Sequence, residues 1–184
     1  DGGMQVITLP DVRDKGSAAR FVQLGKYPPM GERGASTTGA GTEFSLRDDP
    51  ERAFREANES THLMVMFESD EGYEALDEIV AIDGIDMVGV GPMDWGVSLG
   101  LFGDEAKAHL APKIDRVLST AAKAGKIAVA SAADPDEAKH LRDLGVRVMF
   151  LGVDIAMRRN SLAQTLAGVS GALTRCRRYR STIN

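Results

Sequence analysis

The sequence predicts an α/β fold built on a parallel β-sheet. About five short apolar segments have the composition of strands, and amphipathic helical segments alternate with them along the 184 residues. The connections are long enough for the crossovers that parallel strands require. With 43% hydrophobic residues and no linker that would separate domains, residues 1–184 are expected to form a single domain.

Two neighbouring segments predict where a functional site lies. Residues 86–91 form an apolar, glycine-bounded run, which is typical of a buried strand, and Asp94 follows its carboxyl end. One unit earlier, residues 62–67 predict another strand, and Glu68 closes it. Functional groups of parallel α/β folds gather at this edge of the sheet. Because neighbouring strands lie about 4.8 Å apart, Glu68 and Asp94 can converge on one ion.

The first part of the chain predicts a strand, two helices and a long loop. Residues 5–9 predict the strand, which Pro10 ends, and residues 14–24 predict a helix with one apolar face. The small, polar, glycine-rich run 31–41 fits either a loop over a site or a mobile segment. Asp49-Pro50 has the pattern of a helix N-cap and first position, so a helix should run to about Asn58.

The remaining elements follow the same alternation. Ser69 is expected to cap a helix that continues to Val80, and Asp134 is expected to cap a helix that ends near Leu144. The other predicted elements are a glycine-punctuated loop at 96–103, a helix at 111–124, strands at 127–130 and 147–151, and a terminal amphipathic helix with Leu162, Leu166, Val169 and Leu173 on one face.

Composition argues against several classes of partner. The net charge of -5 gives no support for a nucleic-acid partner. No apolar run approaches the roughly 20 residues of a membrane span, and the first residues lack the pattern of a signal peptide. The single cysteine, Cys176, cannot form an internal disulfide, so a reducing, cytoplasmic location is expected.

Several short motifs occur in a specific order and spacing. They are Tyr27-Pro28-Pro29, Gly31-Glu32-Arg33-Gly34, Phe67-Glu68-Ser69, Leu76-Asp77-Glu78-Ile79, Gly84-Ile85-Asp86, Gly91-Pro92-Met93-Asp94, Ser98-Leu99-Gly100 and Gly152-Val153-Asp154. In these motifs, which extend over essentially the whole chain, the sequence resembles the HpcH/HpaI aldolase family of metal-dependent lyases acting on 2-oxo acids, which is related to the citrate lyase beta subunit.

The resemblance implies a (β/α)8 TIM-barrel fold of which about the last five βα units are present. Five strands alone would expose two sheet edges and the apolar interior of the barrel. We therefore expect the chain to be a fragment, or to be completed by a second polypeptide.

The resemblance also implies a divalent metal, Mg²⁺, Mn²⁺ or Co²⁺, held by Glu68 and Asp94. A hard cation with few protein ligands keeps positions that the carboxylate and ketone oxygens of a 2-oxo acid can fill, and it stabilises the enolate formed when the C3–C4 bond breaks. The expected reaction is cleavage of a 4-hydroxy-2-oxo acid to pyruvate and an aldehyde, or the related decarboxylation of oxaloacetate. The opposing interpretation is that both carboxylates are only polar residues at strand ends, with Asp94 as a helix cap.

Substrate contacts are expected from three further places. The backbone N–H groups of Met93 and Asp94 would face the substrate carboxylate. By resemblance, Arg33 fixes its loop over the site or at a subunit contact, with binding of the substrate carboxylate as the other role.

Two residues depart from the family pattern and leave the substrate open, and the family's catalytic base has no counterpart in this chain. Met66 stands where many relatives have a pyruvate-binding glutamine, and Trp95 stands where a smaller residue is usual. The family's catalytic histidine belongs to the absent units, and His62, His109 and His140 are interpreted as surface or structural residues. A catalytically degenerate or split family member acting as an assembly subunit is therefore the alternative.

The end of the chain, residues 160–184, comprises the terminal helix and a basic tail. In the family this helix is often exchanged between subunits of a trimer or hexamer, so a homo-oligomer is expected. The apolar stripe alone fits a plain core position equally. The arginines of 175–180 suit either pairing with a neighbour or a frayed, solvated end.

Overall fold

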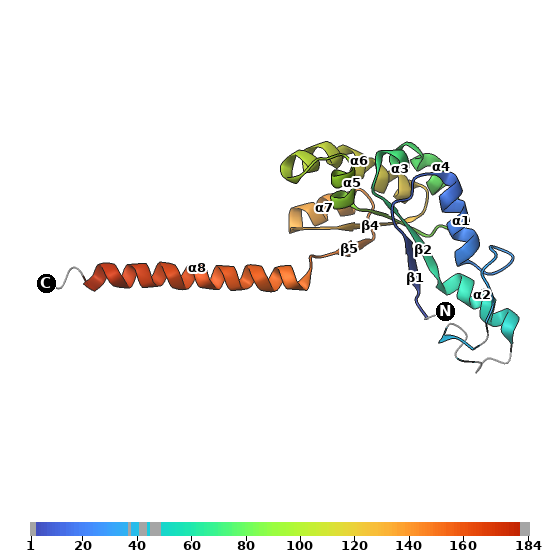
Figure 1. Ribbon diagram of the computed structural model, residues 1–184, viewed down its shortest axis with the longest axis horizontal. Coiled ribbons are helices and arrows are strands. Elements are labelled where there is room, and N and C mark those ends of the chain that lie inside the picture. Colours follow the sequence, from blue (N-terminus) through green and yellow to red (C-terminus); the bar gives the residue numbers. More distant parts are fainter. Residues whose placement is uncertain (1–2, 37, 41–43, 45–48, 181–184) are drawn as a thin grey trace.

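The computed structural model describes residues 3–36, 38–40, 44 and 49–180, and Figure 1 shows their arrangement. The strands are β1 (Val6–Leu9), β2 (His62–Phe67), β3 (Met87–Val90), β4 (Ile127–Ser131) and β5 (Val148–Phe150). The helices are α1 (Lys15–Gly25), α2 (Pro50–Ser60), α3 (Asp70–Glu74), α4 (Leu76–Val80), α5 (Pro92–Ser98), α6 (Gly103–Lys123), α7 (Pro135–Asp143) and α8 (Asp154–Arg180).

Within the described residues, the five strands form one parallel sheet in the order in which they occur along the chain. Sequential parallel order with intervening helices is the arrangement of a (β/α) barrel, so the predicted fold class is confirmed. Phe67 pairs with Val90 in the register of β2 and β3. Consequently Glu68 and Gly91 start side by side at the carboxyl edge of the sheet.

One face of the sheet carries the hydrophobic core. In β2, Leu63, Val65 and Phe67 have no exposed surface, and they pack with buried side chains of α1, α4, α6 and α7. The alternate residues Met64 and Met66 point to the other face and are only partly buried, as the two-residue period of a strand requires. The helices therefore cover the outer face, and the inner face of the barrel-type sheet is partly open within this chain.

The predicted helix caps are confirmed by their hydrogen bonds. The side chains of Asp49, Ser69 and Asp134 accept from backbone N–H groups in the first turns of α2, α3 and α7, respectively. These bonds satisfy donors that have no partner inside a helix. The predicted helix over 70–80 is nevertheless two short helices, because the backbone at Ala75 leaves the helical region with φ -88° and ψ 6°.

The helix predicted at 111–124 is longer than expected. α6 begins at Gly103, and α5 extends to Ser98, so the expected loop at 96–103 is reduced to a short connection. Asp104 and Glu105 in the first turn favour the helix N-terminus, and buried Leu110 anchors this extension to the core. Pro112 lies inside α6 on its exposed side, where water can satisfy the carbonyl that loses its partner.

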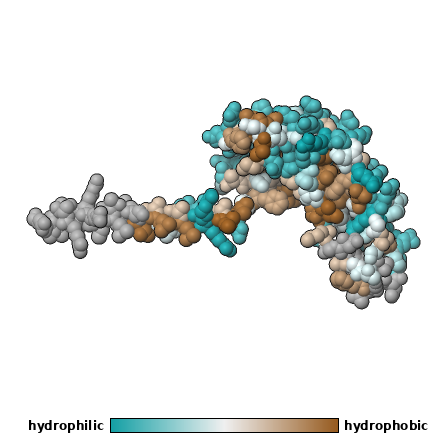
Figure 2. Space-filling model, in the orientation of Figure 1, coloured by the Kyte–Doolittle hydropathy of each residue, from teal (hydrophilic) through white to brown (hydrophobic). Residues whose placement is uncertain are grey.

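The last helix projects away from the rest of the chain (Figure 1). α8 continues to Arg180, so the backbone of the basic segment at 175–180 is helical, and whether this end frays or pairs with a neighbour stays a prediction. Leu162, Leu166 and Val169 are 65%, 66% and 53% exposed, so these three residues of the stripe are not part of this chain's core, and Figure 2 shows apolar surface along the helix. The side chain of Leu173 lies outside the described residues. Among the described helices, none has the length and apolar character needed to cross a membrane.

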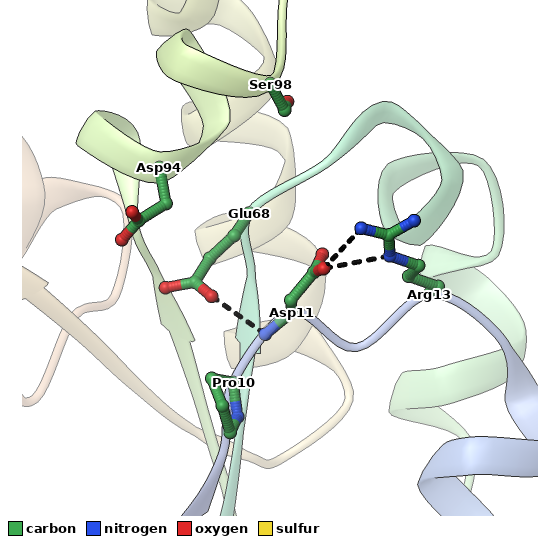
Figure 3. A pocket seen from close by; sticks show the side chains of 6 residues that line it. All are labelled: Pro10, Asp11, Arg13, Glu68, Asp94 and Ser98. Atoms are coloured by element: carbon green, nitrogen blue, oxygen red, sulfur yellow. Dashed lines mark hydrogen bonds and ion pairs between the residues drawn. The ribbon is translucent and has the colours of Figure 1, made fainter.

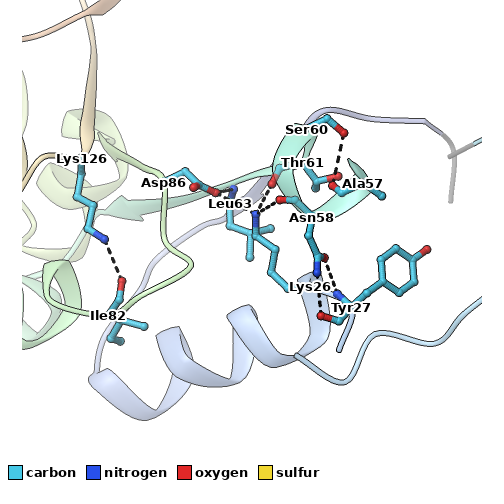
Figure 4. Close-up of polar contacts among 10 residues, drawn as sticks. All are labelled: Lys26, Tyr27, Ala57, Asn58, Ser60, Thr61, Leu63, Ile82, Asp86 and Lys126. Atoms are coloured by element: carbon cyan, nitrogen blue, oxygen red, sulfur yellow. Dashed lines mark hydrogen bonds and ion pairs between the residues drawn. The ribbon is translucent and has the colours of Figure 1, made fainter. Parts of the chain in front are cut away.

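The amino edge of the sheet is held by the buried side chain of Lys26. Its Nζ donates to the carbonyl oxygens of Asn58, at 2.8 Å, and Thr61, and it forms an ion pair with Asp86 Oδ2 at 3.3 Å (Figure 4). Thr61 precedes β2 and Asp86 precedes β3. Lys26 therefore joins the end of α1 to the start of two strands, at the opposite edge from Glu68.

Candidate metal centre

Glu68 is the first residue after β2, and its side chain is 8% exposed. Its Oε2 accepts a hydrogen bond from the backbone N–H of Asp11 at 2.8 Å. In the described part of the chain, Oε1 accepts no hydrogen bond. One carboxylate oxygen is thus fixed by the protein, and the other remains able to bind a ligand.

Asp94 lies in the first turn of α5, just beyond the end of β3. Gly91 is the N-cap residue of this helix, and no side chain forms the cap hydrogen bond. The interpretation of Asp94 as a helix cap is therefore wrong. The Asp94 carboxylate is exposed and is not committed to the backbone.

Glu68 and Asp94 border one cavity of about 390 Å³, together with Pro10, Asp11, Arg13 and Ser98 (Figure 3). The structure therefore brings together the two carboxylates that the strand pattern predicts at neighbouring strand ends. A cavity of this volume is within the usual range for small-molecule sites.

Burial and neighbouring carboxylates make the negative charge of Glu68 unfavourable unless a cation lies beside it. Burial raises the pKa of the Glu68 carboxyl above its usual value, and the negative charges of Asp94 and Asp11 raise it further. The hydrogen bond from the Asp11 N–H acts in the opposite direction. A bound cation would relieve both the lost hydration and the repulsion between the carboxylates.

Gly91 gives the Glu68 side chain the room it occupies. A Cβ atom at position 91 would meet Glu68 Oε1 and would lie 2.7 Å from Glu68 Cγ. The glycine of the Gly91-Pro92 turn is thus required by the close approach of Glu68 to the end of β3.

Asp11 is the residue that connects β1 to this site. Its φ of 45° lies in the left-handed region, which is uncommon for a residue other than glycine. This conformation accompanies the hydrogen bond from its N–H to Glu68 Oε2. Its side-chain Oδ1 is buried and has no hydrogen-bond partner among the described residues, while Oδ2 accepts from Arg13.

The residues present fit a divalent cation of the Mg²⁺ type. Within the described residues no group of three or more His, Cys, Asp or Glu side chains is arranged as a metal cluster. Mg²⁺ is commonly bound by only one or two carboxylates, with water and substrate completing its coordination. The free Oε1 of Glu68 and the uncommitted carboxylate of Asp94 provide such a pair of oxygen donors.

Two residues expected to contact substrate are not among those that line the cavity. Met93 is 75% exposed in the first turn of α5. The guanidinium of Arg33 lies 4.5 Å from the centre of the Tyr27 ring, and Tyr27 bonds Asn58 beside the amino edge of β2. In this structure Arg33 thus stacks on Tyr27 at the opposite edge of the sheet from Glu68, and its binding of the substrate carboxylate stays a prediction.

The histidines lie where the sequence places them. His62 is the first residue of β2, and His109 and His140 belong to α6 and α7. His140 forms an exposed contact with Asp115, which raises the pKa of its imidazole. None of these three side chains lines the cavity. Trp95 is fully buried in the core, so it does not narrow the cavity.

Sequence reasoning missed three of the lining residues, Asp11, Arg13 and Ser98. The sequence does contain a signal for Asp11: this carboxylate comes just after the strand predicted at 5–9, in the same way that Glu68 comes just after the strand predicted at 62–67. Ser98 belongs to a motif that was recognised but given no role. Arg13 could be found only from the conformation of the connection between β1 and α1.

A barrel-type sheet with paired carboxylates at its carboxyl edge defines the class of this protein as an α/β protein with a candidate cation site. The HpcH/HpaI aldolase/citrate lyase family model matches residues 1–161. The chain belongs to this family.

Relatives and solved structures agree with the family. The chain is 34% identical to a hydroxypyruvate/pyruvate aldolase of Roseovarius nubinhibens, covering 91% of this chain and 64% of that protein. It is 35% identical to a 2-keto-3-deoxy-L-rhamnonate aldolase of Escherichia coli, with 91% and 62% covered.

A solved HpcH/HpaI aldolase/citrate lyase family protein from Burkholderia cenocepacia J2315 superposes with a TM-score of 0.79 at 28% identity, covering 90% of this chain and 65% of that one. An HpcH/HpaI aldolase from Desulfitobacterium hafniense DCB-2 gives a TM-score of 0.80 at 24% identity, with 91% and 64% covered. The chain thus spans just under two thirds of the length of these proteins.

Proposed function

We propose that this chain, within a complete barrel, forms a divalent-metal-dependent carbon–carbon lyase that cleaves a 4-hydroxy-2-oxo acid to pyruvate and an aldehyde. Membership of the aldolase family supports carbon–carbon lyase chemistry. The relatives named as hydroxypyruvate/pyruvate aldolase and 2-keto-3-deoxy-L-rhamnonate aldolase support a substrate of the 2-oxo acid class.

The observation that carries the proposal is the shared cavity of Glu68 and Asp94. A scaffold has no need to place two carboxylates at neighbouring strand ends, because their mutual repulsion makes the site less stable without a cation. Here the pair is supported by the Asp11 N–H and by the space at Gly91.

Glu68 and Asp94 would hold the divalent metal, Mg²⁺, Mn²⁺ or Co²⁺. When bound, such an ion supplies a Lewis acid that polarises the ketone of a 2-oxo acid and stabilises the negative charge that develops as the C3–C4 bond breaks. The protein's part is to orient the carboxylates: the Asp11 N–H fixes Glu68 Oε2, and the first turn of α5 carries Asp94.

The backbone N–H groups of Met93 and Asp94 remain proposed contacts for the substrate carboxylate. They belong to the first turn of α5, where N–H groups have no partner inside the helix. No histidine lines the cavity, so the group that removes the C4 hydroxyl proton is proposed to lie outside this chain or to be water.

Metal binding can be tested by thermal denaturation, with and without Mn²⁺, of a protein that contains the complete barrel. A ligand that binds only the folded state raises the midpoint by mass action, by an amount equivalent to about 2.7 kcal/mol at 100 times its dissociation constant. We expect this shift in the wild type and its loss in Glu68→Ala and in Asp94→Ala. Asp104→Ala, which removes an exposed carboxylate from α6, is the matched control.

The reaction is tested in a protein that contains the complete barrel. Metal-dependent release of pyruvate from a 4-hydroxy-2-oxo acid should be abolished by Glu68→Ala and by Asp94→Ala. Activity that survives both substitutions would contradict the assignment of the metal ligands.

A catalytically degenerate assembly subunit is the second candidate. The absence of any histidine among the lining residues and Met66 on the inner face of β2 favour it. A complete barrel that binds Mn²⁺ through Glu68 and Asp94, yet releases no pyruvate from any 4-hydroxy-2-oxo acid, would support this alternative.

A homo-oligomer is proposed from the position of α8. Its described apolar residues are exposed and the helix projects from the sheet (Figure 1). Burial of the stripe against another subunit, in a trimer or hexamer, would remove this apolar surface from water. Leu162→Asp with Leu166→Asp should then lower the mass measured by light scattering.

A further inference from the structure

The turn that follows β1 is bonded to β2 on both sides of Asp11. Before it, Leu9 pairs with Val65 in the register of the two strands. After it, the Val12 N–H donates to the carbonyl oxygen of Met66 at 3.0 Å. The Val12 side chain is 1% exposed and belongs to the core, so its packing also holds this segment. The position of the Asp11 backbone is therefore fixed by its neighbours.

Asp11 turns the chain with a left-handed backbone conformation. Its φ is 45°, a region in which a Cβ atom comes close to the following carbonyl oxygen and which glycine adopts most readily. Its N–H donates to Glu68 Oε2 at 2.8 Å, across 57 positions of the sequence. An uncommon backbone conformation thus coincides with an N–H that is directed at a candidate metal ligand.

This hydrogen bond gives the two oxygens of Glu68 different tasks. Oε2 is engaged by Asp11, whereas among the described residues Oε1 accepts no hydrogen bond. In Figure 3 the free oxygen lies on the opposite side of the carboxylate from Asp11. The side chain is 8% exposed and lies close against Gly91, so its surroundings also restrict it. Glu68 is therefore held so that it offers a cation one oxygen.

The number of oxygens that a carboxylate offers discriminates between divalent cations. Ca²⁺ takes about six to eight oxygen ligands in a flexible geometry, and it commonly binds both oxygens of a carboxylate. Mg²⁺ requires nearly octahedral geometry and is usually bound by one or two carboxylates and several waters. For Ca²⁺ to use both oxygens of Glu68, the bond from the Asp11 N–H to Oε2 would have to break.

We propose that Asp11 is a positioning residue that selects a cation of the Mg²⁺ type over Ca²⁺, because its N–H occupies Glu68 Oε2 and leaves only Oε1 to the metal. This inference rests on the part of the proposed function that places the cation at Glu68 and Asp94. The selecting group is the N–H that the left-handed backbone directs at Glu68. The Asp11 carboxylate attracts either cation through its charge and does not distinguish them.

Two substitutions that both remove the Asp11 carboxylate separate the backbone from the side chain. Glycine adopts the left-handed conformation readily, whereas for valine, which is branched at Cβ, it is an outlier. In a protein that contains the complete barrel, the dissociation constants of Mg²⁺ and Ca²⁺ are measured by displacement of bound Mn²⁺ in calorimetric titrations.

Asp11→Gly should keep the wild-type ratio of the two dissociation constants within about twofold, because the N–H stays in place. In Asp11→Val the ratio should shift toward Ca²⁺ by at least about tenfold, the factor that corresponds to one hydrogen bond to a charged group. A merely structural role would weaken the binding of both cations alike and would leave the ratio unchanged.

Asp11→Ala provides an intermediate case. Alanine opposes the left-handed conformation less than valine does, so the ratio should lie between those of the other two variants. This variant also keeps the test decisive if Asp11→Val does not fold, which thermal denaturation of each variant shows. Asp104→Ala, which removes an exposed carboxylate from α6, is the control for the loss of charge and should keep the wild-type ratio.

Two outcomes overturn the inference while leaving the cation site intact. The same ratio in the wild type and in all folded Asp11 variants would mean that the N–H does not select the cation. An equal shift in Asp11→Gly and in Asp11→Ala or Asp11→Val would mean that the carboxylate is the selecting group. If Glu68→Ala binds Mn²⁺ as tightly as the wild type does, the proposed cation site fails, and the inference fails with it.

Discussion

Trp95 Nε1 donates a hydrogen bond to Asp70 Oδ1 at 2.8 Å. Asp70 comes two residues after Glu68, and Trp95 comes directly after Asp94, so this bond joins the segments that carry the two candidate metal ligands. Lys113 of α6 donates to the same Asp70 oxygen at 2.6 Å, and this bond holds the pKa of the Asp70 carboxyl below its usual value. The spacing of Glu68 and Asp94 therefore depends on a contact outside the cavity.

Trp95→Phe keeps the buried ring but removes this donor. A hydrogen bond to a charged group contributes about 1.5–3 kcal/mol, so the free energy of unfolding should fall by that order. For a domain of this size the thermal midpoint should fall by roughly 3–12 °C. Mn²⁺ should also bind more weakly, because α5 loses its connection to the Glu68 segment.

A double-mutant cycle with Asp70→Asn checks the cause. If the indole and the carboxylate interact directly, the two substitutions should be non-additive by more than about 0.5 kcal/mol. Additive effects would show that Trp95 stabilises the protein only by packing.

Lys26→Met should be strongly destabilising. Lys26 is 2% exposed and binds two carbonyl oxygens and Asp86 at the amino edge of the sheet. The substitution leaves the carbonyl oxygens of Asn58 and Thr61 without this donor, and each buried polar group that loses its partner costs about 1–3 kcal/mol. The Asp86 carboxylate is 31% exposed, so water can partly replace its partner. Chemical denaturation measures the effect.

Lys123→Met is the control for Lys26→Met. Lys123 is exposed in the last turn of α6, and exposed substitutions usually change the free energy of unfolding by less than about 0.5 kcal/mol. Similar effects at the two positions would contradict the role assigned to Lys26.

Much of the fold and the main pair of site residues could be predicted from the sequence because they depend on local patterns. The alternation of strands with helices, and the glycines that mark where strands end, are sufficient to place Glu68 and Asp94 at the ends of neighbouring strands. The start of α6 at Gly103 could not be predicted in this way, because the apolar spacing becomes clear only near Ile114. The exposed stripe of α8 depends on what packs against it, which no local pattern contains.

The site residues that were missed depend on tertiary structure. Asp11 has a left-handed backbone that its sequence context, Pro10-Asp11-Val12, does not require. Its bond to Glu68 is between residues 57 positions apart, and that bond brings Arg13 to the cavity. For Arg33 the motif indicates a functional loop but not which edge of the sheet the loop reaches: Arg33 stacks on Tyr27 beside the amino edge of β2.

The raised pKa of Glu68 predicts how stability depends on pH in the absence of metal. The folded state retains the Glu68 proton to a higher pH than the unfolded state, whose pKa is near the ordinary value of 4.5. Stability from this group is therefore fully present below pH 4.5 and is lost as the pH rises through the folded-state pKa. Glu68→Gln, which cannot ionise, should be more stable than the wild type at pH 7, and the difference should disappear near pH 4.

Denaturation curves recorded from pH 4 to pH 8 measure this dependence. Adding Mn²⁺ at pH 7 should reverse the order, because only the wild type gains a bound cation. A Glu68→Gln protein that is less stable than the metal-free wild type at pH 7 would show that the carboxylate is already compensated by the protein.

Gly91→Ala tests whether the close approach of Glu68 to β3 determines metal affinity. The backbone φ of -115° at Gly91 suits alanine, so the new Cβ affects mainly the Glu68 side chain, whose Cγ and Cδ would lie 2.7 and 2.9 Å away. The Glu68 side chain must then leave its present position, and Mn²⁺ affinity, measured by calorimetric titration, should fall at least about tenfold, or 1.4 kcal/mol. Gly34→Ala has open space around its Cβ and should bind Mn²⁺ as the wild type does.

The loss of stability caused by Gly91→Ala separates this explanation from general damage to the turn. If the Cβ acts through Glu68, the destabilisation seen in Gly91→Ala should largely vanish when Glu68→Ala is already present, because the clashing atoms are gone. If Gly91→Ala destabilises both backgrounds equally, the glycine serves the turn before Pro92, and the position of Glu68 has another cause.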